Sequence, residues 1–359
     1  MKFLLDEDQK QLQDGIGRIL GTDRIQPRVR AVMDGKKTWD DETWQDLVEF
    51  GLPALLVPED NGGMGMSLIE LAVCAEELGR SAAAVPFLGH ALATVAIIEG
   101  GSDEQKARLL PKLASGELIG SVALSDANDT WAPSDWTLTA EGGKISGRKR
   151  NVPHGAVAQL LVVGLAGGRL GVVETANGGV SADTFEVIDL TRPICSIDFD
   201  GAPIELLGEG PAAATRMWDA ALALLAADAF GGCWRILNMT TEYVKVREAF
   251  GAKLADFQAI KHQLANLALE VEPTRGLYWF AAYSFAKEPA KVSHVASLAK
   301  AQTAEVYLET TRLCTELHGG IGFTWEYDSH IWLKRAMFNL AWAGRPQRLF
   351  LRAADDAGF

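Results

Sequence analysis

The chain has 359 residues, of which 48% are hydrophobic and 23% charged, and its formal net charge is −13 at pH 7. This length exceeds one typical core and predicts two or three domains or subdomains with the composition of a soluble globular protein. The acidic balance argues against nucleic acid as a partner, because phosphates are met by basic surface, although a local arginine cluster can still hold a small anion.

The beginning of the chain, MKFLLDEDQKQLQDG, lacks the apolar core of a signal peptide, and no stretch approaches the roughly 18 uninterrupted apolar residues of a membrane span. The four cysteines are Cys74, Cys195, Cys233 and Cys314, with no CxxC or histidine-rich spacing. They predict buried reduced thiols and no metal site. We therefore expect a cytoplasmic protein without a membrane segment.

Residues 1–117 are predicted to be helical. The stretches ETWQDLVEFGLPALLV and LIELAVCAEELGR carry apolar residues at the three- and four-residue spacing of amphipathic helices. The glycine-rich PEDNGGMGMS between them predicts a turn. A Ser-x-x-Gln capping box at Ser102 and Gln105 marks the start of another helix.

Residues 118–209 are predicted to form a β-rich domain. The runs LIGSVALS, WTLTAEGGKISGRKRNV, AQLLVVGLAGGRLGVVET and FEVIDL are short, apolar or alternating, and are separated by Gly, Asp and Asn. The string AEGGK predicts a hairpin turn.

Residues 210–359 are predicted to be helical again. A long core helix leads into EYVKVREAFGAKLADFQAIKH, and further helices are expected at 257–287, 290–318 and 329–353. The string LHGGIGFTWEYDSHIWLKRA interrupts the last two with the adjacent glycines Gly319 and Gly320. By itself a double glycine after a helix is equally well explained as a helix C-cap followed by a loop.

These strings, in this order, resemble the acyl-CoA dehydrogenase family over essentially the whole chain. The similar stretches are GLPALLVPEDNGGMGMSLIELAVCAEELGR, EQKARLLPKLASGELIGSVAL, VREAFGAKLADFQAIKH and LHGGIGFTWEY. The resemblance implies a mainly α fold with an N-terminal helical domain, a central β-barrel and a C-terminal four-helix bundle. It also implies α,β-desaturation of an acyl-CoA thioester with FAD, in which a carboxylate removes the α-proton and hydride passes to the flavin.

The resemblance further implies that the last two strings hold the adenosine and pyrophosphate of FAD bound to a neighbouring subunit. Arg247 would supply a charge-assisted hydrogen bond, Phe250 would pack on the cofactor, and Gln258 would hydrogen-bond it. Gly319 and Gly320 would let the backbone approach the phosphates. The competing interpretation of Arg247 is a solvated helix charge. A site built in this way implies an oligomer.

Three departures from the family pattern accompany this resemblance. The β-domain stretches that hold the flavin ring in the family read LSDANDTWAPSD and KRNVPHGA here; Ser125 and Asp126 echo the first, but the GSD string and the ring-packing tryptophan are missing. Where many relatives have glutamine three residues before the double glycine, this chain has Glu316. A carboxylate there is unfavourable beside a pyrophosphate unless it is paired or turned away.

The third departure concerns the catalytic base. The family's usual C-terminal base lies in a G-T-x-E string, whose counterpart here, WAGRPQRLF, contains Gly344, Arg345, Pro346 and Gln347 but no carboxylate. Because some relatives place the base on the helix preceding R..FG, Glu242 is the candidate catalytic base. The alternative is a surface glutamate, or an ion-pair partner of Lys245 or Arg247.

Together the departures are similar to one subunit of the heteromeric α2β2 acyl-CoA dehydrogenases of bacterial steroid side-chain catabolism. That resemblance implies an unlike partner subunit, a bulky steroid-CoA substrate and electron-transfer flavoprotein as the acceptor. A homo-oligomeric dehydrogenase that uses Glu242 and a non-catalytic scaffold subunit remain open. Several tryptophans could line a roomy apolar pocket, although core packing is the commoner role: Trp234, Trp279, Trp325, Trp332 and Trp342.

Overall fold

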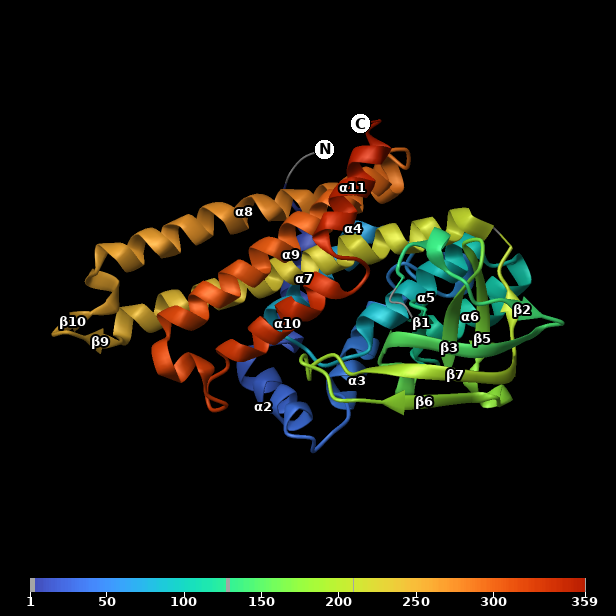
Figure 1. The fold of residues 1–359 in the computed structure, drawn as a ribbon, viewed down its shortest axis with the longest axis horizontal. Coiled ribbons are helices and arrows are strands. Elements are labelled where there is room, and N and C mark those ends of the chain that lie inside the picture. The colour runs from blue at the N-terminus through green and yellow to red at the C-terminus, as the bar shows by residue number, and fades with distance from the viewer. Residues whose placement is uncertain (1–3, 127–129, 209, 359) are drawn as a thin grey trace.

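The computed structural model describes residues 4–126, 130–208 and 210–358. Within them, a helical part, a part with two β-sheets and a second helical part follow one another along the chain (Figure 1). The first helical part connects the other two, because α4 packs against the long helix α7 and α5 packs against strand β1. Its helices are α1 (Glu7–Ile19), α2 (Thr22–Met33), α3 (Asp41–Phe50), α4 (Leu68–Ser81), α5 (Phe87–Gly100) and α6 (Asp103–Ala114).

The predicted local signals of the first part are present. Ser102 and Gln105 form the expected capping box at the start of α6, and Ser67 and Glu70 form a second one at α4. The glycine-rich stretch before α4 is a turn containing the short 3-10 helix Glu59–Asn61. Each capping box satisfies backbone N–H groups that a helix start otherwise leaves without partners.

The middle part, expected as a barrel, consists of two four-stranded sheets that share one apolar core. The strand orders are β1-β4-β5-β8 and β2-β3-β7-β6, and only the β1–β4 pair is parallel among the described ladders. Leu161 of one sheet and Ile197 of the other belong to the same buried cluster. The strands are β1 (Gly120–Ala123), β2 (Ala140–Glu141), β3 (Lys144–Pro153), β4 (Leu160–Leu165), β5 (Arg169–Glu174), β6 (Val180–Thr184), β7 (Ile194–Pro203) and β8 (Glu205–Leu206).

The predicted hairpin at AEGGK joins β2 to β3, with Gly142 and Gly143 both at positive φ. The run FEVIDL, by contrast, is a loop rather than a strand. Phe185 and Ile188 are 45% and 60% exposed, and no described strand pairs with this segment. Apolar composition alone therefore misled the prediction at residues 185–190.

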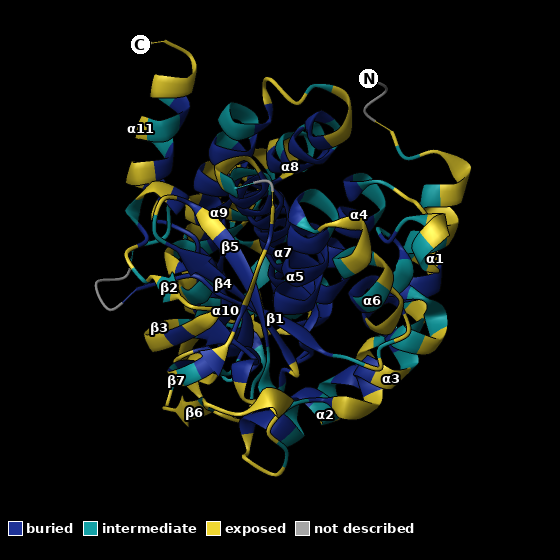
Figure 2. Cartoon of the chain, turned by 90° about the vertical axis from the view of Figure 1, so that its right-hand side faces the viewer, coloured by how far each residue is buried: buried dark blue, intermediate teal, exposed yellow. Residues whose placement is uncertain are grey.

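The second helical part is a bundle of long helices. Figure 2 shows α7 as a dark, buried element in the interior. α7 is apolar and long enough by composition to cross a membrane, but 89% of its apolar window is buried inside the protein. The elements are α7 (Gly210–Val246), hairpin β9 (Glu248–Ala249) and β10 (Ala252–Lys253), α8 (Gln258–Lys287), α9 (Val292–Leu317), the 3-10 helix η7 (Gly319–Phe323), α10 (Ser329–Ala341) and α11 (Pro346–Asp356).

The single helix predicted at 329–353 is in fact two helices, α10 and α11. Ala343 and Gly344 between them have φ of 62° and 117°, values that a helix cannot contain. Pro346 then occupies the first turn of α11, where its missing N–H costs nothing. The break places a loop beside the β-sheets.

Candidate functional site

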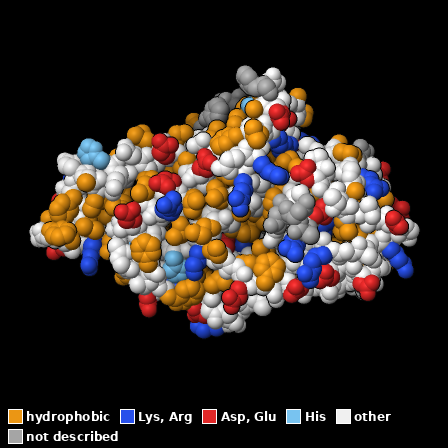
Figure 3. Space-filling view, viewed as in Figure 1, with side chains coloured by type: hydrophobic (Ala, Val, Ile, Leu, Met, Phe, Trp, Pro, Cys, Tyr) orange, Lys and Arg blue, Asp and Glu red, His pale blue; other side chains and the backbone are white. Residues whose placement is uncertain are grey.

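The six predicted cofactor-binding residues lie at one end of the helical bundle. This surface, which we call the bundle tip, comprises hairpin β9–β10, the start of α8 and the end of α9 with η7 (Figure 1). All six residues are exposed: Arg247, Phe250, Gln258, Glu316, Gly319 and Gly320. Figure 3 shows hydrophobic side chains gathered at the left end of the molecule, where this hairpin lies.

An aromatic cluster that the sequence reasoning missed holds the bundle tip together. The Tyr243 ring lies 4.4 Å from the His318 ring, which in turn lies 4.8 Å from the Tyr327 ring. The Tyr243 hydroxyl donates to the His318 carbonyl oxygen at 3.2 Å. These contacts connect the end of α7 to the end of α9 and to the segment after η7. The signal was available, because an EY dipeptide stands in each of the two conspicuous strings.

The three glycines of the tip differ in what requires them. Gly319 has φ of 64°, and a Cβ on Gly322 would lie 2.5 Å from the Thr315 carbonyl oxygen. Gly320 has neither constraint, because its φ is not positive and a Cβ there would meet no atom within 4 Å. Nothing within the described chain requires a glycine at 320, and its open backbone is suited to an approaching ligand.

Two further predicted cofactor-binding residues, Arg247 and Phe250, have exposed side chains at the tip. Arg247 is exposed, and its guanidinium makes no hydrogen bond or ion pair with any described residue. Phe250 has φ of 53° and is 97% exposed, with its ring 6.4 Å from that of Phe257. An exposed aromatic ring and a guanidinium without an internal partner are groups of the kind that bind the adenosine and phosphates of a dinucleotide.

The two carboxylates predicted near the tip are exposed. Glu242 lies in the last turns of α7 with its side chain 73% exposed, and its Oε1 pairs with Lys245 Nζ at 2.7 Å. This is the surface ion pair that the sequence offered as the alternative to a catalytic base. Glu316 is exposed and has no ion-pair partner in the described part of the chain. A base that removes a weakly acidic proton needs a dry, enclosed position, whereas Glu242 is exposed on the surface of this single chain.

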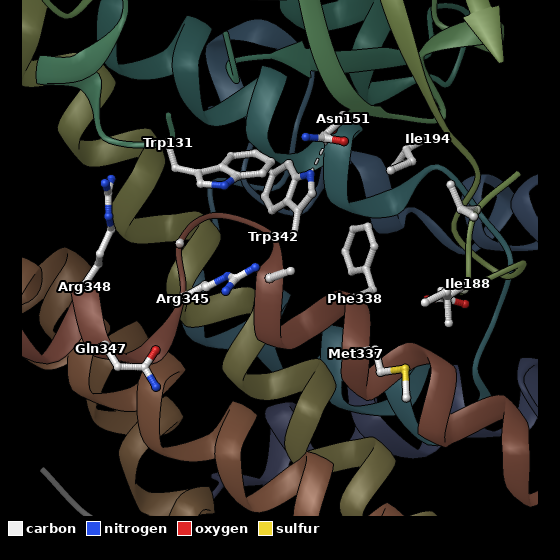
Figure 4. Close-up of a pocket in the computed structure, with 14 residues that line it drawn as sticks. Trp131, Asn151, Ile188, Ile194, Met337, Phe338, Trp342, Arg345, Gln347 and Arg348 are labelled. Carbon is white, nitrogen blue, oxygen red and sulfur yellow. Dashed lines mark hydrogen bonds between the residues drawn. The ribbon is translucent and has the colours of Figure 1, made fainter. Parts of the chain in front are cut away.

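The two β-domain stretches that depart from the family pattern and the stretch WAGRPQRLF contribute residues to a single cavity, far along the bundle from the tip. We call this cavity of about 540 Å³ the aromatic pocket. It lies between α10, the start of α11 and the β-sheets (Figure 4). Its lining residues are Trp131, Asn151, Val187, Ile188, Asp189, Ile194, Met337, Phe338, Ala341, Trp342, Gly344, Arg345, Gln347 and Arg348.

Two indole rings occupy the side of the pocket next to the sheets. The Trp131 and Trp342 rings lie 5.1 Å apart, and Trp342 also stacks on Phe338 at 6.1 Å. The Trp342 Nε1 donates to the Asn151 carbonyl oxygen at 3.0 Å, as the dashed line in Figure 4 shows. This hydrogen bond satisfies the buried indole N–H and fixes the ring in place. Trp131, Trp342 and Phe338 thus form an aromatic wall on this side of the pocket.

Asp126, which is similar to the family pattern in the first β-domain stretch, has a structural role. Asp126 accepts from Lys149 Nζ at 2.5 Å and from the Thr137 backbone N–H at 2.7 Å. Burial lowers the pKa of Lys149, against the opposing effect of Asp126. Asp126 is therefore committed to a buried ion pair, and residues 127–129 of the same stretch lie outside the described residues.

The loop that would carry the family's base contributes no carboxylate to the pocket. Arg345 and Gln347 line it instead, and Figure 4 shows the Arg345 guanidinium pointing into the pocket beneath the indoles. Buried Lys300 of α9 connects that helix to the α10–α11 loop. Its Nζ donates to the carbonyl oxygens of Leu340, in the last turn of α10, and Gly344, in the loop. Burial lowers the pKa of Lys300 to about 7.

A buried ionic network forms the wall behind Phe338. Asp228 of α7 pairs with Arg192 at 2.5 Å and with Arg335 at 2.6 Å, and Asn339 donates to it at 2.9 Å. Burial would raise the pKa of Asp228, but the two guanidinium charges hold it below its usual value. The network joins α7, α10 and the loop before β7, and this loop also carries Asp189 into the pocket.

The predicted tryptophans divide between core and pocket. Trp332 and Trp279 are buried in the core, and Trp234 packs against it. Trp325 is 43% exposed at the surface and stacks on His330. Trp342 lines the aromatic pocket, together with Trp131, which the sequence reasoning had not singled out. The four cysteines are free and buried, as predicted. No group of metal-binding side chains occurs among the described residues.

Comparison with known proteins agrees with the whole-chain resemblance. Residues 6–117 match the acyl-CoA dehydrogenase N-terminal domain and residues 208–355 the C-terminal domain. Acyl-CoA dehydrogenase IpdE2 of Mycobacterium tuberculosis is 30% identical over 351 residues, covering 98% of this chain and 97% of that protein.

Solved structures show the same relationship. The Tcur3481–Tcur3483 steroid ACAD variant superposes with a TM-score of 0.89 at 32% identity, covering 98% of both chains. Butyryl-CoA dehydrogenase of Megasphaera elsdenii has the same fold, with a TM-score of 0.89 at 21% identity over 99% of this chain and 100% of that one.

Proposed function

The chain belongs to the acyl-CoA dehydrogenase family, and we propose that it is one subunit of a heteromeric member that shares its flavin with an unlike partner. FAD is the cofactor of this family; it accepts the hydride that leaves the substrate's Cβ. The proposal assigns to this chain the adenosine and phosphate half of a flavin site whose ring is held by the partner.

The observation that carries the proposal is the contrast between the two sites in one chain. At the bundle tip, Arg247, Phe250 and Gly320 are exposed and fit a dinucleotide brought by another subunit. In the aromatic pocket, Trp131 and Trp342 line the side next to the sheets, and the α10–α11 loop lacks a carboxylate. A chain with half a cofactor site needs a partner that has the other half.

In this arrangement the residues of the chain bind and orient and do not transfer protons. Arg247 would neutralise phosphate charge, and the Phe250 ring would exclude water from one face of the cofactor. The partner would supply the base that removes the α-proton, and electron-transfer flavoprotein would take the electrons. The substrate we propose is a bulky acyl-CoA of the steroid side-chain type, supported by similarity to IpdE2 and to a structure named as a steroid ACAD with two differently named chains.

The test is the flavin content of the purified chain, alone and after co-expression with the product of the neighbouring gene. We expect visible flavin absorbance only with the partner. Flavin bound by the isolated chain would instead support the homo-oligomeric dehydrogenase that uses Glu242. Absence of flavin from an assembled complex would support a scaffold subunit, with the tip retained for packing alone.

A further inference from the structure

We propose that Arg30 of α2 is a positioning residue for the cofactor site at the bundle tip. It lies 298 residues before Asp328, in the first helical part, yet it holds the segment that follows the double glycine. Figure 1 shows α2 beside the loop that leads into α10. The inference rests on the proposed shared flavin site, and it gives the N-terminal helices a part in cofactor binding.

The Arg30 guanidinium bonds to this segment at two points. Its Nε donates to Asp328 Oδ1 at 2.9 Å, and its Nη2 donates to the same oxygen. Its Nη1 donates to the Trp325 carbonyl oxygen at 2.6 Å. The Arg30 and Asp328 side chains are 20% and 32% exposed, so water and salt screen this ion pair less than a fully exposed one. One planar side chain thus fixes both a carboxylate and a backbone carbonyl of residues 325–328.

The Trp325 side chain adds a second connection between this segment and α2. Its Nε1 donates to Oδ1 of Asp34, the residue at which α2 ends, at 3.2 Å. The Arg30 guanidinium lies 5.7 Å and the Lys334 ammonium 4.8 Å from the centroid of the indole. The His330 ring stacks on the indole at 5.1 Å. Although the indole is at the surface, residues of α2 and α10 therefore hold it from several directions.

The double glycine lies between two such fixed points. Gly320 has no positive φ, and a Cβ there would meet no atom within 4 Å of the described chain, so its position depends on its flanks. Before it, the Tyr243 hydroxyl holds the His318 carbonyl oxygen. After it, Arg30 holds the Trp325 carbonyl oxygen. A backbone that is already ordered binds a ligand more tightly, because less conformational entropy is lost on binding.

The first test measures FAD release from the assembled complex. Arg30→Met keeps an unbranched apolar stem and removes the guanidinium. We expect FAD to dissociate about two- to thirtyfold faster, the range for residues that act on a site through intermediate contacts. Arg30→Lys can meet Asp328 but not the Trp325 carbonyl at the same time, so its rate should lie between the two. Arg24→Met is the matched control, because Arg24 is also on α2 but pairs with Asp46 of α3 at 2.6 Å, and its rate should equal that of wild type.

The second test measures the segment itself, by amide hydrogen exchange of the full-length chain without FAD. Exchange at residues 319–324 should be faster in Arg30→Met than in wild type and unchanged in Arg24→Met. Asp328→Asn breaks the same ion pair from the other side. Combined with Arg30→Met, it should release FAD no faster than the faster of the two single variants. Asp328→Asn alone provides the comparison if Arg30→Met does not assemble.

The outcomes separate the role of Arg30 from the function on which it rests. FAD release from Arg30→Met at the wild-type rate, or unchanged exchange at residues 319–324, would overturn the proposal. A wild-type complex that holds no flavin would instead refute the shared flavin site, and with it the cofactor role of Arg30. The two failures are distinguishable, because the exchange measurement needs no flavin.

Discussion

Arg247 is the residue at the bundle tip with the most specific expected role. Its guanidinium has no partner in the described chain, so its removal breaks no internal contact. We expect Arg247→Ala in the assembled complex to weaken FAD retention by about 1.5–3 kcal/mol, the usual value of a hydrogen bond to a charged group, without changing the melting temperature. Flavin absorbance after dilution and gel filtration measures this loss. Lys253→Ala on the same hairpin is the control, and full flavin occupancy in Arg247→Ala would refute the assignment.

Glu242 offers a test of which subunit supplies the base. Because its side chain is 73% exposed and paired with Lys245, we expect Glu242→Gln to change turnover of the complex by less than about tenfold, or ~1.4 kcal/mol. A catalytic carboxylate replaced by its amide would instead lose several orders of magnitude in kcat with little change in KM. Steady-state kinetics, with flavin content verified first, separate the two outcomes. A large loss of kcat would restore Glu242 as the base.

Lys300 gives the chain a predictable pH dependence. Burial lowers its pKa to about 7 in the folded protein, whereas an unfolded lysine has a pKa of roughly 10.4. Between these values the unfolded chain binds a proton that the native lysine has released. The free energy of unfolding therefore receives a contribution that rises with pH, by up to ~1.4 kcal/mol per pH unit. Urea unfolding of wild type and Lys300→Met across this window should show the rise only in the wild type. Equal slopes would show that the native lysine remains charged.

At the scale of elements, the approach of α4 to α7 depends on glycines on both helices. A Cβ on Gly231 would lie 1.9 Å from the Glu76 carbonyl oxygen, and one on Gly79 would lie 2.0 Å from that of Asp228. Backbone cannot yield as the end of a side chain can, so the helices would have to separate. The close crossing of the two helices helps to position α7. Asp228 of α7 is the central carboxylate of the ionic network behind the aromatic pocket.

We expect Gly231→Ala to lower the free energy of unfolding by about 1–3 kcal/mol, the usual cost of overpacking a core. Gly276→Ala on α8 is the matched control, because a Cβ there meets nothing within 4 Å and alanine favours helix by up to about 1 kcal/mol. Chemical denaturation of the two variants should therefore give shifts of opposite sign. A stabilised Gly231→Ala would mean that α4 and α7 do not approach as closely as described.

At the scale of the whole molecule, periodicity predicted the elements that local sequence controls. The ends of α8 and α9 lie within about two residues of expectation, because their apolar spacing and end signals are local. The break at Gly344 was missed although glycine and proline stand there, since a helical pattern continues on both sides. FEVIDL was misassigned because strand pairing depends on distant partners that an apolar run does not reveal.

The bundle tip and the aromatic pocket also differ in how far the sequence could predict them. Arg247 and the double glycine stand in continuous strings and could be read from the sequence. The aromatic pocket joins Trp131, Asn151, Asp189 and Arg345 from four separate segments, and each is unremarkable in its own context. The sequence shows what three of these stretches lack, but not that they face one another. Only the fold brings the substitutions together.

That convergence bears on whether one carboxylate could restore a dehydrogenase. In the isolated chain, Gln347→Glu places an acid in the first turn of α11, at a position that already lines the pocket. A base there can act only if a flavin lies beside it to accept hydride, and the Trp131 and Trp342 rings already occupy one side of this pocket. We therefore expect no acyl-CoA-dependent reduction of an electron-accepting dye by this variant or by Arg345→Glu. The complex with its partner, assayed in parallel, is the positive control. Measurable turnover by either isolated variant would show that the pocket admits a flavin ring after all, and the chain would then need no unlike partner to complete its cofactor site.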